Sequence, residues 1–194
     1  MAVMSLEELS AKQEITELLY RYCRGIDRLD WDLVRSCYHD DAFDDHGLVR
    51  GGVDEFVAFF TEMLTPMIAT THMLGNILIT LDGDVAGCES QILAWHRIPA
   101  DGENPVRDLT AQGRYVDRIE RRDGEWRIAH RTVVFDWTRI EPAGEEFPVG
   151  PDGIWSRHSR RPVRCRPRAS RGRLEGLRGP GPRRCLVHRR AQRQ

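Results

Sequence analysis

An aspartate and a histidine that lie far apart in the chain, Asp27 and His72, have the side chains needed for proton transfer. Asp27 follows Cys23 by four residues and continues the apolar stripe of a predicted helix. His72 heads an apolar run, residues 73–79, that is typical of a buried strand. Because a carboxylate on an apolar face is costly without a partner, we predict that the two side chains meet in a pocket. Alternatively, Asp27 caps a turn and His72 is an ordinary core histidine, and spacing alone favours this interpretation.

The chemistry open to such a pair is general acid–base catalysis. A neutral imidazole can remove a proton from carbon near neutral pH, and an aspartate on Nδ1 would fix its tautomer and stabilise the imidazolium that forms. Tyr22, five residues before Asp27, could donate a hydrogen bond to a carbonyl or a leaving hydroxyl, or could be a core tyrosine. These residues favour elimination or double-bond migration, and we expect neither a metal nor an organic cofactor.

The N-terminal part of the chain has helical periodicity. Residues 5–8 form a capping-box pattern, which opens a helix that we expect to end near Gly25. Asp30 caps a second, shorter helix, and the apolar stripe of residues 53–64 predicts a third, which Pro66 helps to terminate.

Two groups of residues are candidates for metal binding, and neither has suitable spacing. The acidic stretch 39–46 lacks the regular pattern of a calcium loop, so we expect a solvated turn there. The five cysteines lack the close pairing of a zinc site. Reduced, mostly buried thiols are expected instead.

From Thr70 onwards the periodicity becomes that of β-strands. We expect four long strands, at residues 71–81, 85–98, 109–121 and 125–140. Tight turns join most of them. Three helices followed by such a meander predict an α+β fold, a cone-shaped α+β barrel with the three N-terminal helices packed on a curved antiparallel sheet.

This order of elements resembles the SnoaL-like branch of the nuclear transport factor 2 superfamily over roughly residues 5–140. The closest pattern is that of the group containing scytalone dehydratase, lindane dehydrochlorinase and bile acid 7α-dehydratase. The members of this group share an Asp–His dyad. The residues that carry the resemblance are Tyr22, Asp27, His72, the hairpin at 122–126 and Arg131.

The resemblance implies roles for individual residues. His72, Asp27 and Tyr22 would be catalytic, and Arg131 would bind substrate in the pocket. An ion pair with one of the many acids is the alternative for Arg131. His96 matches a second pocket histidine more loosely, since either it or Trp95 could face inwards.

The interior of the predicted cone should be apolar. The residues expected to line it are Phe56, Phe60, Leu74, Leu93, Val133, Phe135 and Trp137. Such a lining favours a hydrophobic cyclic substrate, for example a steroid, a terpenoid or a polyketide. Because this superfamily hosts many activities on one fold, the alternatives are a protein that binds such a compound without changing it and an accessory subunit of a dioxygenase.

The sequence also suggests partners and a compartment. Apolar residues expected on the outer sheet face, Ile77, Ile79 and Ile92, would need cover, so we expect a homodimer or homotrimer. Residues 1–12 resemble neither a signal peptide nor a membrane span. We therefore expect a cytoplasmic protein with no membrane partner.

Charge divides the chain unequally. Residues 151–194 contain 14 arginines and two acids, a charge of +12, which leaves −13 on residues 1–150. We expect a folded domain at 1–145 and a disordered, Arg-rich tail at 146–194. A nucleic-acid-binding arm or a lid over the cone are alternatives for this tail. Its composition, rich in Arg, Pro and Gly, fits a shifted reading frame in GC-rich DNA better than it fits a nucleic-acid-binding arm. Nucleic acid is therefore not an expected partner.

Overall fold

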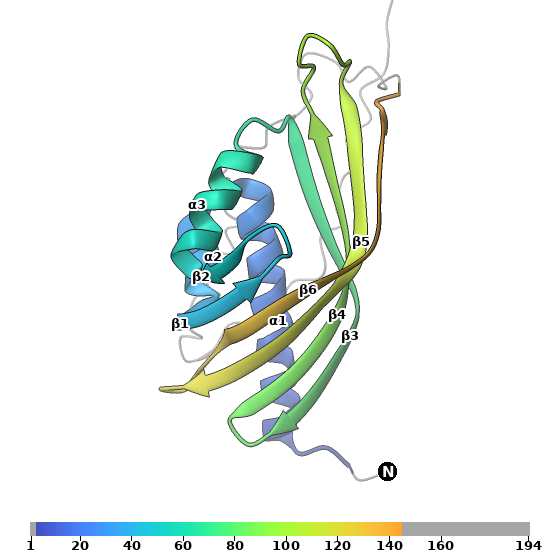
Figure 1. Cartoon of the computed structure of the whole chain (residues 1–194). Coiled ribbons are helices and arrows are strands. Elements are labelled where there is room, and N and C mark those ends of the chain that lie inside the picture. The colour runs from blue at the N-terminus through green and yellow to red at the C-terminus, as the bar shows by residue number, and fades with distance from the viewer. Residues whose placement is uncertain (1–2, 145–194) are drawn as a thin grey trace, which may run out of the picture. The chain divides into compact units, whose positions relative to one another are not determined.

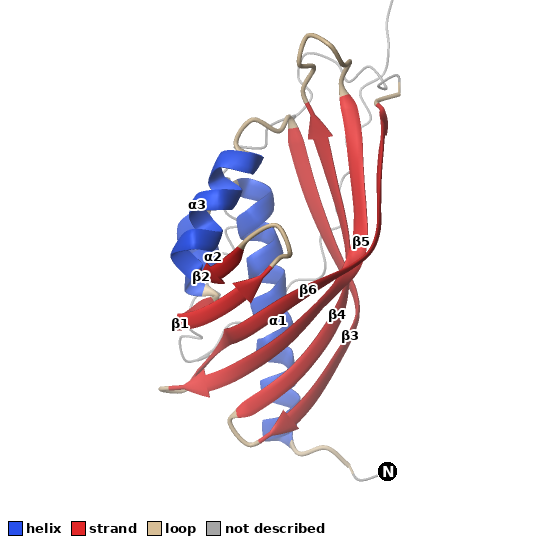
Figure 2. Ribbon diagram, in the orientation of Figure 1, coloured by secondary structure: helices blue, strands red, loops and turns tan. Residues whose placement is uncertain are grey.

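A computed structural model describes residues 3–144, in which helices cover one face of a six-stranded sheet (Figures 1 and 2). The predicted α+β class, with three helices and four long strands, is confirmed. No helix within residues 3–144 is long and apolar enough to cross a membrane. The predicted domain boundary at residue 145 and the expectations for the Arg-rich tail concern residues that lie outside the described ones, and they stay predictions.

The first helix, α1 (Leu6–Arg28), begins as predicted and ends later than predicted. The Ser5 side chain accepts a hydrogen bond from the Glu8 backbone N–H at 3.1 Å, and the Glu8 carboxylate accepts one from the Ser5 N–H at 2.7 Å. Gly25 does not end α1, which continues to Arg28. A Cβ on Gly25 would lie 2.7 Å from a methyl group of Val34 in the next helix. The glycine thus allows close helix packing, and Asp27 falls in the last turn of α1.

The other two helices follow their predicted signals. Asp30 caps α2 (Trp31–Ser36), its side chain accepting from the Leu33 N–H at 3.2 Å. The third helix, α3 (Val53–Leu64), buries the apolar stripe that predicted it and ends before Pro66. Figure 1 shows α1 and α3 on the same side of the sheet.

The sheet is open and mixed rather than closed and antiparallel. Its strands are β1 (Tyr38–Asp45), β2 (Arg50–Gly52), β3 (Ala69–Asp82), β4 (Val85–Ile98), β5 (Arg107–Arg122) and β6 (Glu125–Pro142). They lie in the order β2-β1-β6-β5-β4-β3, so that β2 and β3 are the two edges. The expectation of an antiparallel sheet was wrong because β1, which was not predicted, pairs in parallel with β6.

The acidic stretch expected to be a solvated turn is strand β1 and the residue after it. Asp44 is 1% exposed and lies beside Arg131 of β6 in the strand pairing. His46, just beyond the strand, is also buried. The prediction failed because the partners that make these polar side chains tolerable in the interior come from other parts of the chain.

A β-bulge in β3 determines which of its side chains face the helices. The register against β4 shifts between Gly75 and Leu78. The more buried positions are therefore 70, 72 and 74 before the bulge and 77, 79 and 81 after it. The placing of Ile77 and Ile79 on the outer face was wrong, because it assumed an uninterrupted alternation.

A bulge near the end of β6 also reverses the alternation of its side chains. Gln112 pairs with Trp137 and Gly113 with Phe135, which leaves Asp136 as an extra residue in β6. A Cβ on Gly113 would lie 2.2 Å from a backbone oxygen of β6, so only glycine fits there. Trp137 is exposed as a result, and its placing in the interior was wrong.

Strand β4 alternates without interruption. Ile92, Ala94 and His96 are buried, whereas Leu93 is exposed. The expectations that Leu93 lines the interior and that Ile92 lies on the outer face were therefore both wrong. Of the two residues that competed for the inward position, His96 is the more buried and Trp95 lies on the opposite face.

Candidate active site

A cavity of about 330 Å³ lies between the helices and the sheet, with a mostly apolar and aromatic lining. The predicted site residues that line it are Tyr22, Phe56, Phe60, His72, His96, Val133 and Phe135. Leu74, which was also expected to bind substrate, instead packs half-buried against the core. The geometry therefore gathers most of the predicted substrate-binding residues around one space.

Asp27 and His72 are in direct contact, as their positions predicted. Oδ1 of Asp27 lies 2.7 Å from Nδ1 of His72, and Oδ2 accepts a hydrogen bond from the His72 backbone N–H at 3.0 Å. The imidazole lines the cavity, and the carboxylate is not among the cavity-lining groups. Since Nδ1 is engaged by Asp27, Nε2 is the nitrogen that remains for a ligand.

His96 lies beside this pair. Its ring makes an edge contact with the His72 ring, with centroids 5.4 Å apart. Its Nδ1 lies 2.6 Å from the hydroxyl oxygen of Thr70 on the neighbouring strand. His96 thus helps to fix one wall of the cavity and is close enough to His72 to contact the same ligand.

Tyr22 presents its ring to the cavity from α1 and is almost completely buried. Burial raises the pKa of its phenol, while the nearby Arg131 charge opposes part of that increase. The phenol therefore stays protonated at neutral pH and can act as a hydrogen-bond donor.

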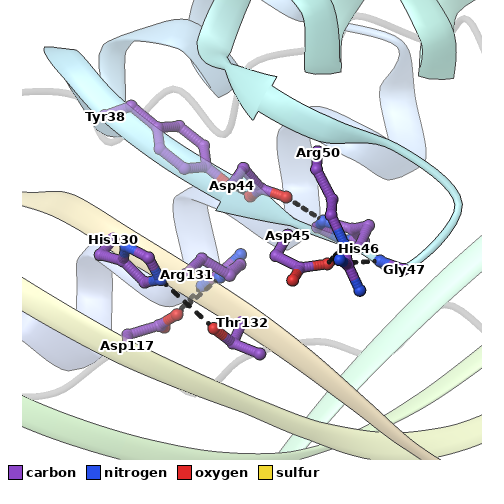
Figure 3. Close-up of polar contacts among 10 residues, drawn as sticks. All are labelled: Tyr38, Asp44, Asp45, His46, Gly47, Arg50, Asp117, His130, Arg131 and Thr132. Atoms are coloured by element: carbon purple, nitrogen blue, oxygen red, sulfur yellow. Dashed lines mark hydrogen bonds and ion pairs between the residues drawn. The ribbon is translucent and has the colours of Figure 1, made fainter.

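Arg131 lies behind the cavity wall rather than in it. Its guanidinium group donates to Asp117 through Nε at 2.8 Å and Nη2 at 2.7 Å (Figure 3). The same group lies over the rings of Tyr22 and Tyr115, 4.2 Å and 4.0 Å from their centroids. Arg131 is fully buried and does not line the cavity, so a direct role in substrate binding has no support in this geometry.

The sequence-based prediction missed a second Asp–His contact at the cavity. Nδ1 of His46 bonds to Oδ1 of Asp44, and the Tyr38 hydroxyl donates to Oδ2 of the same carboxylate at 2.7 Å (Figure 3). His46 lines the cavity. The signal that could have found the pair is the two-residue spacing of Ala42, Asp44 and His46, which places all three on one face of a strand.

The cysteines of the described region, Cys23, Cys37 and Cys88, are buried free thiols, as predicted. Burial raises the pKa of Cys23 and of Cys88 to about 12, so neither is a reactive thiolate at neutral pH. Within residues 3–144, no group of three or more His, Cys, Asp or Glu side chains is placed to hold a metal ion.

Residues 7–132 match the family model described as the SnoaL-like domain. The Mycobacterium tuberculosis protein Rv2910c, which is uncharacterized, is 28% identical over 134 residues, which cover 67% of this chain and 88% of that protein.

Two solved structures show the same fold. A type 2 hexachlorocyclohexane dehydrochlorinase, LinA, has a TM-score of 0.65 and 22% identity, covering 77% of this chain and 99% of its own. A Novosphingobium aromaticivorans protein, provisionally assigned as a scytalone dehydratase, has a TM-score of 0.62 and 21% identity, with coverages of 73% and 95%.

Proposed function

The chain belongs to the SnoaL-like family, and we propose that it is a cofactor-independent lyase or isomerase acting on a hydrophobic cyclic small molecule. The observation that carries the proposal is the Asp27–His72 contact of 2.7 Å at the wall of an apolar cavity. A dehydrochlorinase and a provisional scytalone dehydratase among the proteins of similar fold support a lyase-type role.

In the proposed reaction, Nε2 of His72 removes a proton from a carbon next to a substrate carbonyl. Asp27 stabilises the imidazolium that forms and holds the ring in one orientation, because its second oxygen is bound to the His72 backbone N–H. The electron pair left on carbon then either expels a β-substituent or is protonated elsewhere, giving elimination or isomerisation.

Tyr22 is the proposed hydrogen-bond donor to the carbonyl oxygen, where negative charge develops. Burial keeps its phenol protonated, and the Arg131 cation 4.2 Å from the ring centroid favours added negative charge on the phenol and its acceptor. Arg131 would therefore act through Tyr22 and not by touching the substrate. Asp117 and the two tyrosine rings hold it there.

The lining of the cavity favours the substrate class. Its polar groups are few, and its walls are largely rings and aliphatic side chains, including Phe56, Phe60 and Ile92. A volume of about 330 Å³ is suited to a single small organic molecule. A hydrophobic ring compound with one or two oxygen substituents fits such a site best.

The test is turnover of a panel of cyclic β-hydroxy ketones by the wild type, His72→Gln and His130→Gln. The last is a matched control, because His130 is exposed and does not line the cavity. We expect dehydration by the wild type and the control and none above background by His72→Gln, with ligand binding kept in all three. Binding without turnover in the wild type would instead indicate a carrier or an accessory subunit.

We also propose that the protein is a homodimer or homotrimer. Met73 and Leu78 are 62% and 68% exposed, and Trp137 is exposed on the same outer face of the sheet. Exposed apolar side chains gathered on one face are typical of an interface. Light scattering at micromolar concentration should therefore give two or three times the chain mass, and Leu78→Glu should lower it. A monomeric wild type would contradict the proposal.

A further inference from the structure

A second imidazole reaches the same cavity with a carboxylate on its Nδ1. His46 follows β1 and His72 lies on β3, and these strands are separated in the sheet by β6, β5 and β4. The two imidazoles therefore approach the cavity from different flanks of the sheet. Asp44 holds His46 as Asp27 holds His72, so Nε2 is again the nitrogen left for a ligand.

The packing of the His46 ring fixes its position. Its centroid lies 5.0 Å from the Phe56 ring and 5.0 Å from the Phe60 ring, and 6.2 Å from the Tyr115 ring. All three aromatic residues line the cavity. His46 is thus held on one side by aromatic rings and at Nδ1 by Asp44, which is the arrangement needed to aim Nε2 repeatedly at one place.

The two carboxylates differ in burial. The Asp44 side chain is 1% exposed, whereas that of Asp27 is 21% exposed and also binds a backbone N–H. A carboxylate buried as deeply as Asp44 needs an adjacent positive charge as well as hydrogen bonds, one of which Tyr38 donates. Asp27 has partial access to water and depends less on such a charge.

His46 is the one basic side chain bonded to Asp44 within residues 3–144. Arg131, a buried cation on the neighbouring strand β6, donates both of its hydrogen-bonded nitrogens to Asp117, so these two charges balance each other. The imidazolium form of His46 would balance the remaining charge on Asp44. When two similar titratable groups lie in different environments, one can serve as the acid and the other as the base.

We propose that His46 is the general acid that protonates the leaving hydroxyl, while His72 is the base. This inference rests on the proposed function. His72 Nε2 takes the proton from carbon, the electron pair of that C–H bond forms the new C=C bond, and the C–O bond breaks. Its electron pair stays on oxygen, which takes the proton from Nε2 of His46 and leaves as water. The products are a neutral His46 and a protonated His72, and proton exchange with water restores both.

The test compares two leaving groups in the same ring. A cyclic β-hydroxy ketone needs a proton on its leaving oxygen, whereas the matched β-chloro ketone releases chloride and needs none. His46→Gln should raise the ratio of kcat for the chloro ketone to kcat for the hydroxy ketone about 100-fold, after the uncatalysed rates are subtracted. His72→Gln should slow both substrates, and His130→Gln should leave both rates unchanged.

A second variant guards against misfolding of His46→Gln. Asp44→Asn should raise the same ratio.

The possible outcomes distinguish the acid role of His46 from the proposed function on which it rests. Equal losses for both substrates in His46→Gln and Asp44→Asn would overturn the acid role and leave the proposed function standing. No conversion of either ketone by the wild type would contradict both. A raised ratio of chloro-ketone to hydroxy-ketone turnover in both variants would support the assignment of His46.

Discussion

Oδ1 of Asp27, on the last turn of α1, lies 2.7 Å from Nδ1 of His72 on β3, although the two residues are 45 positions apart in sequence. The second oxygen of the carboxylate binds the His72 backbone N–H, so Asp27 holds both the ring and the strand that carries it. This double contact makes Asp27 the positioning residue of the proposed base.

The Asp27→Asn variant should lower kcat about 100-fold or more, with a smaller effect on KM. An amide can donate its own N–H to Nδ1 of His72, which would leave the proton on Nε2 and remove the base. Steady-state kinetics on a cyclic hydroxy ketone would measure the effect, with the melting temperature as a check on folding. Wild-type kcat in a folded variant would show that Asp27 does not set the state of His72.

The Arg131→Met variant should destabilise the fold by about 3–5 kcal/mol, because it leaves the Asp117 carboxylate buried and unpaired. Urea unfolding would measure the loss. Arg118→Met is the matched control, since Arg118 pairs with Glu120 while its side chain is 57% exposed, and its effect should be about 1 kcal/mol or less. Similar losses in the two variants would contradict the assignment of Arg131 as a buried structural cation.

Stability should fall as the pH rises above about 9. Burial raises the pKa of Cys23 to about 12, so the unfolded chain releases this proton at lower pH than the folded chain. The stabilisation is fully present below the ordinary thiol pKa and is lost as the pH approaches 12. Urea unfolding under reducing conditions from pH 7 to 11 should show a smaller decline for Cys23→Ala. Parallel curves for the two proteins would contradict this role for the thiol.

Much of the site could be predicted because its signals are local. Asp27 extends a helical stripe that begins at a capping box, and His72 heads an apolar strand, so each was visible in a short window of sequence. Their meeting required only that the helix pack on the sheet. Tyr22 followed from its place on the same helix face as Asp27 and from the resemblance to known enzymes.

The features that the sequence-based prediction missed depend on contacts between segments that are distant in the chain. Strand β1 was not predicted, because Asp44 is acceptable in the interior only with Tyr38 and His46 bonded to it and with β6 alongside. The bulges shift the register against neighbouring strands, and the sequence of β3 or β6 alone does not indicate where the alternation reverses. For this reason the sides assigned to Ile77 and Trp137 were wrong.

The central claim is that His72 removes a proton from substrate carbon, and hydrogen exchange tests it without any leaving group. A cyclic ketone is incubated with the protein in D₂O, and proton NMR follows deuterium entering the position next to the carbonyl. The wild type should accelerate this exchange and His72→Gln should not, because Nε2 is the proposed base. Equal exchange rates for the two proteins, or no acceleration by the wild type, would contradict the account.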